Sequence, residues 1–212
     1  MSSANTVFKS GVTLAAIAAI CTSLVALTYH LTADRIAAND KALLEQSLHP
    51  ALSDLFYDSG VSESRLVLAP PHDLPGNDEA IIYRVYANDE PVAALFVVTA
   101  RDGFAGNIRI LLGVDMSGVV TGIRILKHRE TPGLGDKIDA SRSDWVEQFP
   151  GRSMGDPAVT DWAIRRDGGQ FDQLTGASVT PRAVLKAMRD TLLYFNANRD
   201  EIFAAPATEE PS

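Results

Sequence analysis

The stretch Ala80-Ile-Ile-Tyr-Arg-Val-Tyr-Ala-Asn-Asp-Glu-Pro-Val-Ala-Ala-Leu-Phe-Val-Val-Thr99 contains two runs rich in β-branched and aromatic residues, separated by residues 88–91. Val, Ile, Tyr and Phe favour extended strands, whereas Asn, Asp and Pro favour tight turns. The pattern repeats downstream, where residues 107–114 and 119–126 flank a turn at residues 115–118. Four short strands joined by tight turns predict an antiparallel meander.

A meander of this kind has an apolar face that needs a covering layer of helices. Two downstream segments can provide it: residues 144–149, and a longer helix that begins with Pro181 as its first residue and Thr180 as its N-cap. Strands followed by helices predict an α+β fold, with a parallel α/β fold as the weaker alternative. The longer helix carries one apolar stripe, formed by Val184, Leu185, Met188, Leu192 and Phe195.

Residues 11–31 form a run of 21 residues without a formally charged side chain. At about 1.5 Å per residue, a helix of this length spans about 31 Å, which matches the roughly 30 Å hydrocarbon core of a bilayer. We therefore predict a transmembrane helix over residues 11–31, preceded by a cytoplasmic N-terminus over residues 1–10. A cleaved signal peptide, whose apolar region is shorter, and a buried helix of a soluble domain are the two alternatives.

The rest of the chain divides by composition. Residues 32–79 are predicted to form a helical linker followed by a peripheral cover with one short strand near residues 64–68. Residues 80–203 form the main domain, and residues 204–212 form a disordered tail. Lys9 precedes the apolar run, which favours a cytoplasmic N-terminus and places the bulk of the chain outside the cytoplasm.

Composition excludes several classes of function. The 212 residues include 19 basic and 27 acidic ones, and the net charge of −8 disfavours binding to nucleic acid or to anionic lipid. The single cysteine, Cys21, provides no disulfide framework, and the four histidines lack the spacing of metal ligands. We predict no metal site and no catalytic residue, so redox chemistry in this chain would require an organic cofactor.

Residues 172–181, Asp-Gln-Leu-Thr-Gly-Ala-Ser-Val-Thr-Pro, place three hydroxyl side chains directly before the long predicted helix: Thr175, Ser178 and Thr180. The start of a helix combines unpaired N–H donors with the positive end of the helix dipole, so it can bind a phosphate group. A well-capped junction between a loop and a helix, without any ligand, explains the same residues.

A second unusual segment follows the last predicted strand. Residues 130–135, Glu-Thr-Pro-Gly-Leu-Gly, combine two glycines and a proline among charged neighbours. The backbone can approach a planar ring closely at Gly133 and Gly135, and Leu134 can pack on that ring. A plain surface loop is the alternative interpretation.

The two segments resemble the signatures of the FMN-binding domain family, whose covalent members carry FMN joined through its phosphate to a hydroxyl side chain. Residues 130–135 match one signature throughout. In the attachment motif the acceptor position falls on Ser178, where the family usually carries Thr. The resemblance therefore implies a phosphoester of FMN on Ser178, while Thr175 and Thr180 offer the same chemistry nearby. The other cofactor-binding residues that it implies are Asp172, Thr175, Gly176, Ala177, Thr180, Glu130, Thr131, Gly133, Leu134 and Gly135.

With one N-terminal anchor added, the chain resembles the G-subunit family of Rnf-type electron transport complexes. The C subunits of sodium-translocating NADH:quinone reductases share both motifs but tend to be longer. The resemblance implies a flavoprotein subunit of an ion-translocating oxidoreductase in the bacterial inner membrane, with its bulk in the periplasm and no independent active site. It would relay electrons among partner subunits in ferredoxin/NAD redox, after a flavin transferase has attached FMN. An anchored extracytoplasmic binding or sensor module without a cofactor is the alternative from another class.

Overall fold

The computed structural model describes residues 11–12, 14–29, 31–32, 47, 51–52 and 64–204. The chain divides into two compact units, Met1–Leu43 and Leu44–Ser212. In the first unit, residues 11–12, 14–29 and 31–32 are helical. Among the described residues, none of the helices combines the length and the apolar character that crossing a membrane requires. The predicted N-terminus at residues 1–10, almost all of the predicted linker helix and the tail from residue 205 lie outside the described residues.

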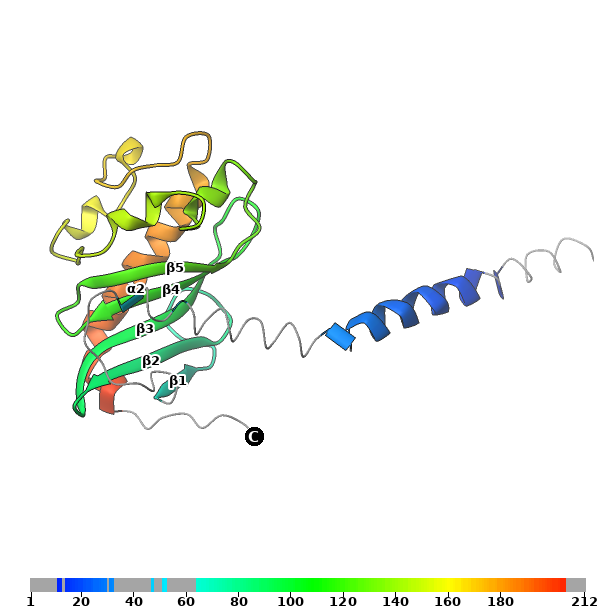
Figure 1. Cartoon of the computed structure of the whole chain (residues 1–212), viewed down its shortest axis with the longest axis horizontal. Helices are drawn as coiled ribbons and strands as arrows, with labels where there is room; N and C mark the ends of the chain where they lie inside the picture. The colour runs from blue at the N-terminus through cyan, green and yellow to red at the C-terminus, as the bar shows by residue number, and fades with distance from the viewer. Residues whose placement is uncertain are drawn as a thin grey trace, which may run out of the picture. The chain divides into compact units, whose positions relative to one another are not determined.

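The second unit is built on a five-stranded antiparallel sheet, with strands in the order of the chain (Figure 1). The meander predicted from residues 80–126 is confirmed, and the turn between its first two strands has positive φ at Asn88 and Asp89, 52° and 64°. Two such residues match the right-handed twist of a hairpin. The strands are β1 (Arg65–Leu68), β2 (Ala80–Ala87), β3 (Glu90–Ala100), β4 (Ile108–Asp115) and β5 (Val120–Lys127). The short strand predicted near residues 64–68 is therefore an edge strand of the sheet, paired with β2.

One face of the sheet packs against α2 (Val179–Ala204), which runs across it in Figure 1. Side chains paired across neighbouring strands form a continuous row on this face: Ile82 opposite Phe96, Phe96 opposite Leu112, and Leu112 opposite Ile123. Phe96 meets Phe195 of the helix edge to face, with ring centroids 5.9 Å apart. All five residues of the predicted helical stripe are buried, which confirms the α+β architecture.

The opposite face of the sheet also buries apolar side chains, which we did not predict from the sequence. Leu95, Val97 and Leu111 form a second cluster with Ala51 and Leu52. The backbone of this short segment is held to the sheet, because the hydroxyl of Thr121 donates a hydrogen bond of 2.6 Å to the carbonyl of Ala51. The sheet is thus an inner layer over much of its area.

Between β5 and α2 the chain forms short 3-10 helices: η1 (Gly135–Ile138), η2 (Asp144–Gln148), η3 (Val159–Asp161) and η4 (Arg165–Asp167). The helix predicted at residues 144–149 is this η2, capped by the Ser143 hydroxyl, which accepts a bond from the N–H of Trp145. Trp145 and Trp162 lie in the core, within a cluster of aromatic rings that includes Phe149 and Phe171. This cluster fixes the segment that leads into α2.

Candidate functional site

The two segments singled out from the sequence meet around one cavity of about 170 Å³. Residues 130–135 contribute Glu130, Thr131, Leu134 and Gly135 to its wall, and the segment before α2 contributes Gly176, Ala177, Ser178 and Thr180. Val179 and Phe104 complete the lining. Two stretches that are about 40 residues apart in the chain therefore line a single cavity.

Glu130 connects the three segments that line this cavity: the loop that contains Phe104, residues 130–135 and the start of α2. Its side chain is buried, and its two carboxyl oxygens accept hydrogen bonds from different segments. Oε1 accepts the N–H of Ala105 at 3.0 Å, and Oε2 accepts the hydroxyl of Thr180 at 2.5 Å. Because buried polar groups are costly unless they are paired, these two bonds fix the loop at residues 101–107 and the start of α2 relative to residue 130.

Two glycines make room for the Glu130 carboxyl group. A Cβ atom added at Gly135 would lie 2.8 Å from Oε2 of Glu130 and 3.0 Å from the Thr180 hydroxyl. A Cβ atom at Gly103 would lie 2.9 Å from Oε1 of Glu130 and would collide with the carbonyl oxygen of Gly106. Both positions therefore require glycine, because other parts of the protein approach their backbone closely.

The loop at residues 130–135 folds around one carbonyl group. The carbonyl oxygen of Thr131 accepts the N–H groups of Leu134, Gly135 and Asp136 at 3.1 to 3.3 Å. Gly133 has φ +78°, a left-handed conformation that glycine adopts without strain. The tight turn presents the Leu134 side chain outward at the cavity, where it is 42% exposed.

The second segment forms its own turn. The N–H of Ala177 donates to the carbonyl of Leu174 at 3.1 Å, and Gly176 has φ +83°. A Cβ atom on Gly176 would lie 3.0 Å from the Leu134 side chain, so the two turns approach each other closely at this point. The turn leads directly into Ser178 and the helix.

The predicted start of that helix is wrong by two residues. Helix α2 begins at Val179, so Ser178 occupies the position that precedes it, and Pro181 is the third helical residue. Thr180 is not the N-cap, because its side chain is fully buried and its hydroxyl bonds to Glu130 instead. Ser178 is therefore the hydroxyl residue at the helix N-terminus, where N–H donors and the positive dipole end coincide.

A cation lies beside Ser178. Nη1 of Arg182 is 3.3 Å from the Ser178 hydroxyl oxygen, and the same guanidinium forms a bidentate pair with Asp167, at 2.5 and 2.7 Å. The hydrogen bond from Arg182 lowers the pKa of Asp167, and the same bond raises the pKa of Arg182. The pair keeps the guanidinium in place beside Ser178.

Three of the predicted site residues do not line this cavity. Asp172 forms an ion pair with Arg165 at 3.0 Å, and its carbonyl accepts the indole N–H of Trp145 at 2.6 Å, so it supports the segment from outside. Thr175 is exposed in the turn. Gly133 lines a neighbouring cavity of about 370 Å³, which shares Glu130 with the first.

Phe104 is one of two lining residues, with Val179, that the sequence pattern did not reveal. It lies in the loop between β3 and β4, lines the cavity, and is 70% exposed. The signal available in the sequence was a single aromatic residue between Gly103 and Gly106, outside any strand or helix pattern. A single aromatic residue in a loop produces no periodic sequence pattern that would single it out.

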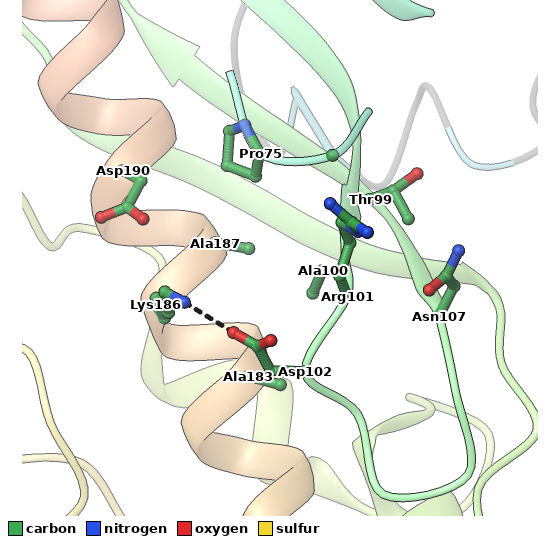
Figure 2. Close-up of a pocket in the computed structure, with 11 residues that line it drawn as sticks. Pro75, Thr99, Ala100, Arg101, Asp102, Asn107, Ala183, Lys186, Ala187 and Asp190 are labelled. Atoms are coloured by element: carbon green, nitrogen blue, oxygen red, sulfur yellow. Dashed lines mark hydrogen bonds and ion pairs between the residues drawn. The ribbon is translucent and has the colours of Figure 1, made fainter. Parts of the chain in front are cut away.

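A further cavity, of about 500 Å³, lies on the other side of the same loop, between it and α2 (Figure 2). Its lining is polar, and Lys186 of α2 pairs with Asp102 across it, with 2.6 Å between Nζ and Oδ2. The hydrogen bond from Lys186 lowers the pKa of Asp102. Neither flavin-like motif contributes to this cavity.

The chemistry of the first cavity suits a ligand with an anionic end and a planar apolar body. A hydroxyl at a helix N-terminus, next to Arg182, can hold a phosphate group. The large exposed side chains of Phe104, Leu134 and Val179 surround the same opening. At about 170 Å³ the cavity is smaller than the roughly 300 Å³ at which pockets enclose a ligand of drug size, so a flavin held here would be partly exposed.

Two family models match this chain, one over the domain that contains the cavity and one over the N-terminal region. A family model described as "FMN-binding domain" matches residues 103–193, and one described as "RnfG N-terminal region" matches residues 1–50. The chain is 42% identical over 203 residues to the G subunit of the ion-translocating oxidoreductase complex of Shewanella amazonensis, covering 95% of this chain and 94% of that protein. The proteins of the same name from Vibrio vulnificus and Shewanella loihica are each 40% identical, and the alignments cover 95% and 97% of both chains.

Proposed function

The chain belongs to the family of G subunits of ion-translocating oxidoreductase complexes, and from this we propose that it is a membrane-anchored flavoprotein that relays electrons through covalently bound FMN. It acts as a subunit of an oxidoreductase complex and has no active site of its own. The relatives at 37–42% identity carry the name of the G subunit, which favours this assignment over the C subunit of a sodium-translocating NADH:quinone reductase.

The observation that carries the proposal is the meeting of both motifs at one cavity, with Ser178 at the start of a 26-residue helix. The hydroxyl oxygen of Ser178 would bear the FMN phosphate in the mature protein. The first N–H groups of α2 and the guanidinium of Arg182 would stabilise the remaining negative charge of that phosphate, with about 0.3–1 kcal/mol from the helix end.

Of the three candidate hydroxyls, the geometry favours Ser178. Thr180 is fully buried and donates its hydrogen to Glu130, so its oxygen is not available to a modifying enzyme. Thr175 is exposed but does not line the cavity. Only Ser178 combines a place on the cavity wall with a cation beside its oxygen.

Bound FMN would supply the capacity to accept and release electrons. The protein's part is to hold the ring at a fixed position and to control its exposure. Leu134 and Phe104 offer it an apolar surface, and Glu130 keeps the surrounding segments together. A cavity open to the surface suits exchange of electrons with partner subunits, and a covalent tether prevents loss of the cofactor.

The membrane anchor is part of the same proposal. It is supported by the uncharged run at residues 11–31 and by the match of residues 1–50 to the N-terminal region of the family. The complex lies in the bacterial inner membrane, with the bulk of this chain in the periplasm. Its partners are the other subunits of the complex and a flavin transferase that attaches FMN.

The test is peptide mass spectrometry of the full chain co-expressed with a flavin transferase. We expect FMN on the peptide that contains Ser178, loss of FMN in Ser178→Ala, and retention in Ser178→Thr. Thr175→Ala is the matched control in the same turn and should keep its flavin. Flavin on Thr175 with Ser178 unmodified would refute the attachment site, and an unmodified chain would refute the flavoprotein assignment.

A further inference from the structure

The cavity beside Ser178 has one wall that neither motif supplies. It is formed by Phe104, which projects from the loop between Ala100 at the end of β3 and Ile108 at the start of β4. Burying a large aromatic side chain is strongly favourable, yet this one is 70% exposed. Together with the other exposed apolar side chains at the opening, this ring gives the cavity an apolar rim that a bound ligand would cover.

The loop makes contacts with the rest of the domain on both sides of Phe104. On one side, Asp102 pairs with Lys186 of α2, as Figure 2 shows. On the other side, the N–H of Ala105 donates to the buried carboxyl group of Glu130. The ring is therefore carried by a loop held at two points and is not the tip of an unattached segment.

The other large side chains at the opening, Leu134 and Val179, are aliphatic, and both are about two-fifths exposed. Phe104 is the aromatic residue among those that line the cavity. Aromatic rings favour offset or edge-to-face contact with another π-system at centroid distances of about 4.5–7 Å. The lining of the cavity thus offers a planar ligand ring one aromatic surface, on Phe104, and one aliphatic surface, on Leu134.

We propose that Phe104 is a flavin-contacting residue whose ring stacks against the isoalloxazine of the FMN carried by Ser178. This inference rests on the proposed function. Glu130 acts through Phe104 as a positioning residue, because it holds the N–H of Ala105 next to the ring. The contact sets the environment of the flavin and is separate from its attachment, which depends on Ser178.

The test uses Phe104→Trp in the full chain with covalent FMN. An indole in contact with a flavin quenches its fluorescence by electron transfer, whereas a phenyl ring is too difficult to oxidise to do so. The larger ring has space, since the Phe104 side chain is mostly exposed. We expect a severalfold loss of native flavin fluorescence relative to the wild type, with full recovery when the protein is denatured.

Leu193→Trp is the matched control. Leu193 is an exposed residue of α2, 14 residues after Val179. A separation of 14 residues corresponds to about 21 Å along a helix. The flavin fluorescence of the Leu193→Trp variant should equal that of the wild type. As a second measurement, Phe104→Leu should change the visible circular dichroism of the bound flavin while the fluorescence of the denatured protein band stays the same.

The outcomes separate the two proposals. Attached flavin whose native fluorescence and dichroism are unchanged in both Phe104 variants would refute stacking and leave the flavoprotein assignment intact. Variants that leave the flavin signals unchanged but lose co-purification with the other subunits would also refute stacking, because they would identify Phe104 as a protein contact. Absence of flavin in the wild type would refute both proposals.

Discussion

The hydroxyl of Thr180 donates a 2.5 Å hydrogen bond to Oε2 of Glu130, which joins two residues 50 positions apart in the chain. The bond connects the first turn of α2 to the loop that follows β5. Both residues are buried, so neither side chain has ready access to water as a substitute partner.

Removing the hydroxyl should therefore destabilise the fold. Thr180→Val leaves one buried oxygen of Glu130 without its donor, which costs about 1–3 kcal/mol, whereas Thr180→Ser keeps the bond. Chemical denaturation of the purified full chain measures the loss. Thr160→Val is the matched control, because its hydroxyl bonds to Asp161 at an exposed site. Equal stability of the Thr180 and Thr160 valine variants would contradict this account of the Glu130 contact.

Gly135→Ala should displace the Glu130 carboxyl group, because the added Cβ would lie 2.8 Å from Oε2. We expect reduced stability, by about 1–3 kcal/mol if one bond of Glu130 is lost. At Gly155 the nearest atom to an added Cβ is 4.0 Å away. Gly155→Ala should therefore be neutral or stabilising, by up to about 1 kcal/mol, through reduced freedom of the unfolded chain. Thermal unfolding of the two alanine variants side by side decides whether close packing at residue 135 matters.

The stabilisation of the fold by the ion pair between Arg182 and Asp167 should decrease as the pH falls. The hydrogen bond within this pair lowers the pKa of Asp167, so the folded state binds that proton less readily than the unfolded chain does. The stabilisation is fully present above the usual aspartate pKa of about 3.9 and is lost as the pH falls through the lower folded value. The stability difference between the wild type and Asp167→Asn should thus shrink on acidification. A difference that grows towards low pH would contradict the assignment.

The topology can be tested with reporter fusions. An alkaline phosphatase fused after residue 40 should be active, because that enzyme requires export, and a green fluorescent reporter that folds in the cytoplasm should be inactive there. A fusion before residue 11 should show the opposite pattern. The expectation rests on the uncharged run at residues 11–31. Cytoplasmic activity after residue 40 would overturn the periplasmic placement.

The sheet was predictable because its signals are local. Alternating β-formers and the Asn-Asp turn at residues 88–89 are contained within each hairpin, and the stripe that includes Val184 and Phe195 lies within one helix. The second buried face was missed, although the unbroken apolar run at residues 92–98 is typical of a strand covered on both sides.

The start of α2 was mispredicted for a non-local reason. Thr180 and Pro181 form a good capping signal in isolation, but the hydroxyl of Thr180 points inward to a partner 50 residues away. The resemblance to a sequence motif points to Ser178 as the acceptor position, but it carries no information on the neighbouring hydroxyl of Thr180, which is buried. Phe104 was not predicted because its role depends on a cavity that exists only when three segments meet.

The order of the strands bears on how the protein matures. Each strand pairs with the next one in the chain, so the sheet closes only short loops and should form early in folding. Docking α2 and forming the bond between Glu130 and Thr180 close much longer loops, so they should come later. The last region to form is commonly among the first to open by local fluctuation. The turn that bears Ser178 should then become accessible by local opening while the sheet stays intact.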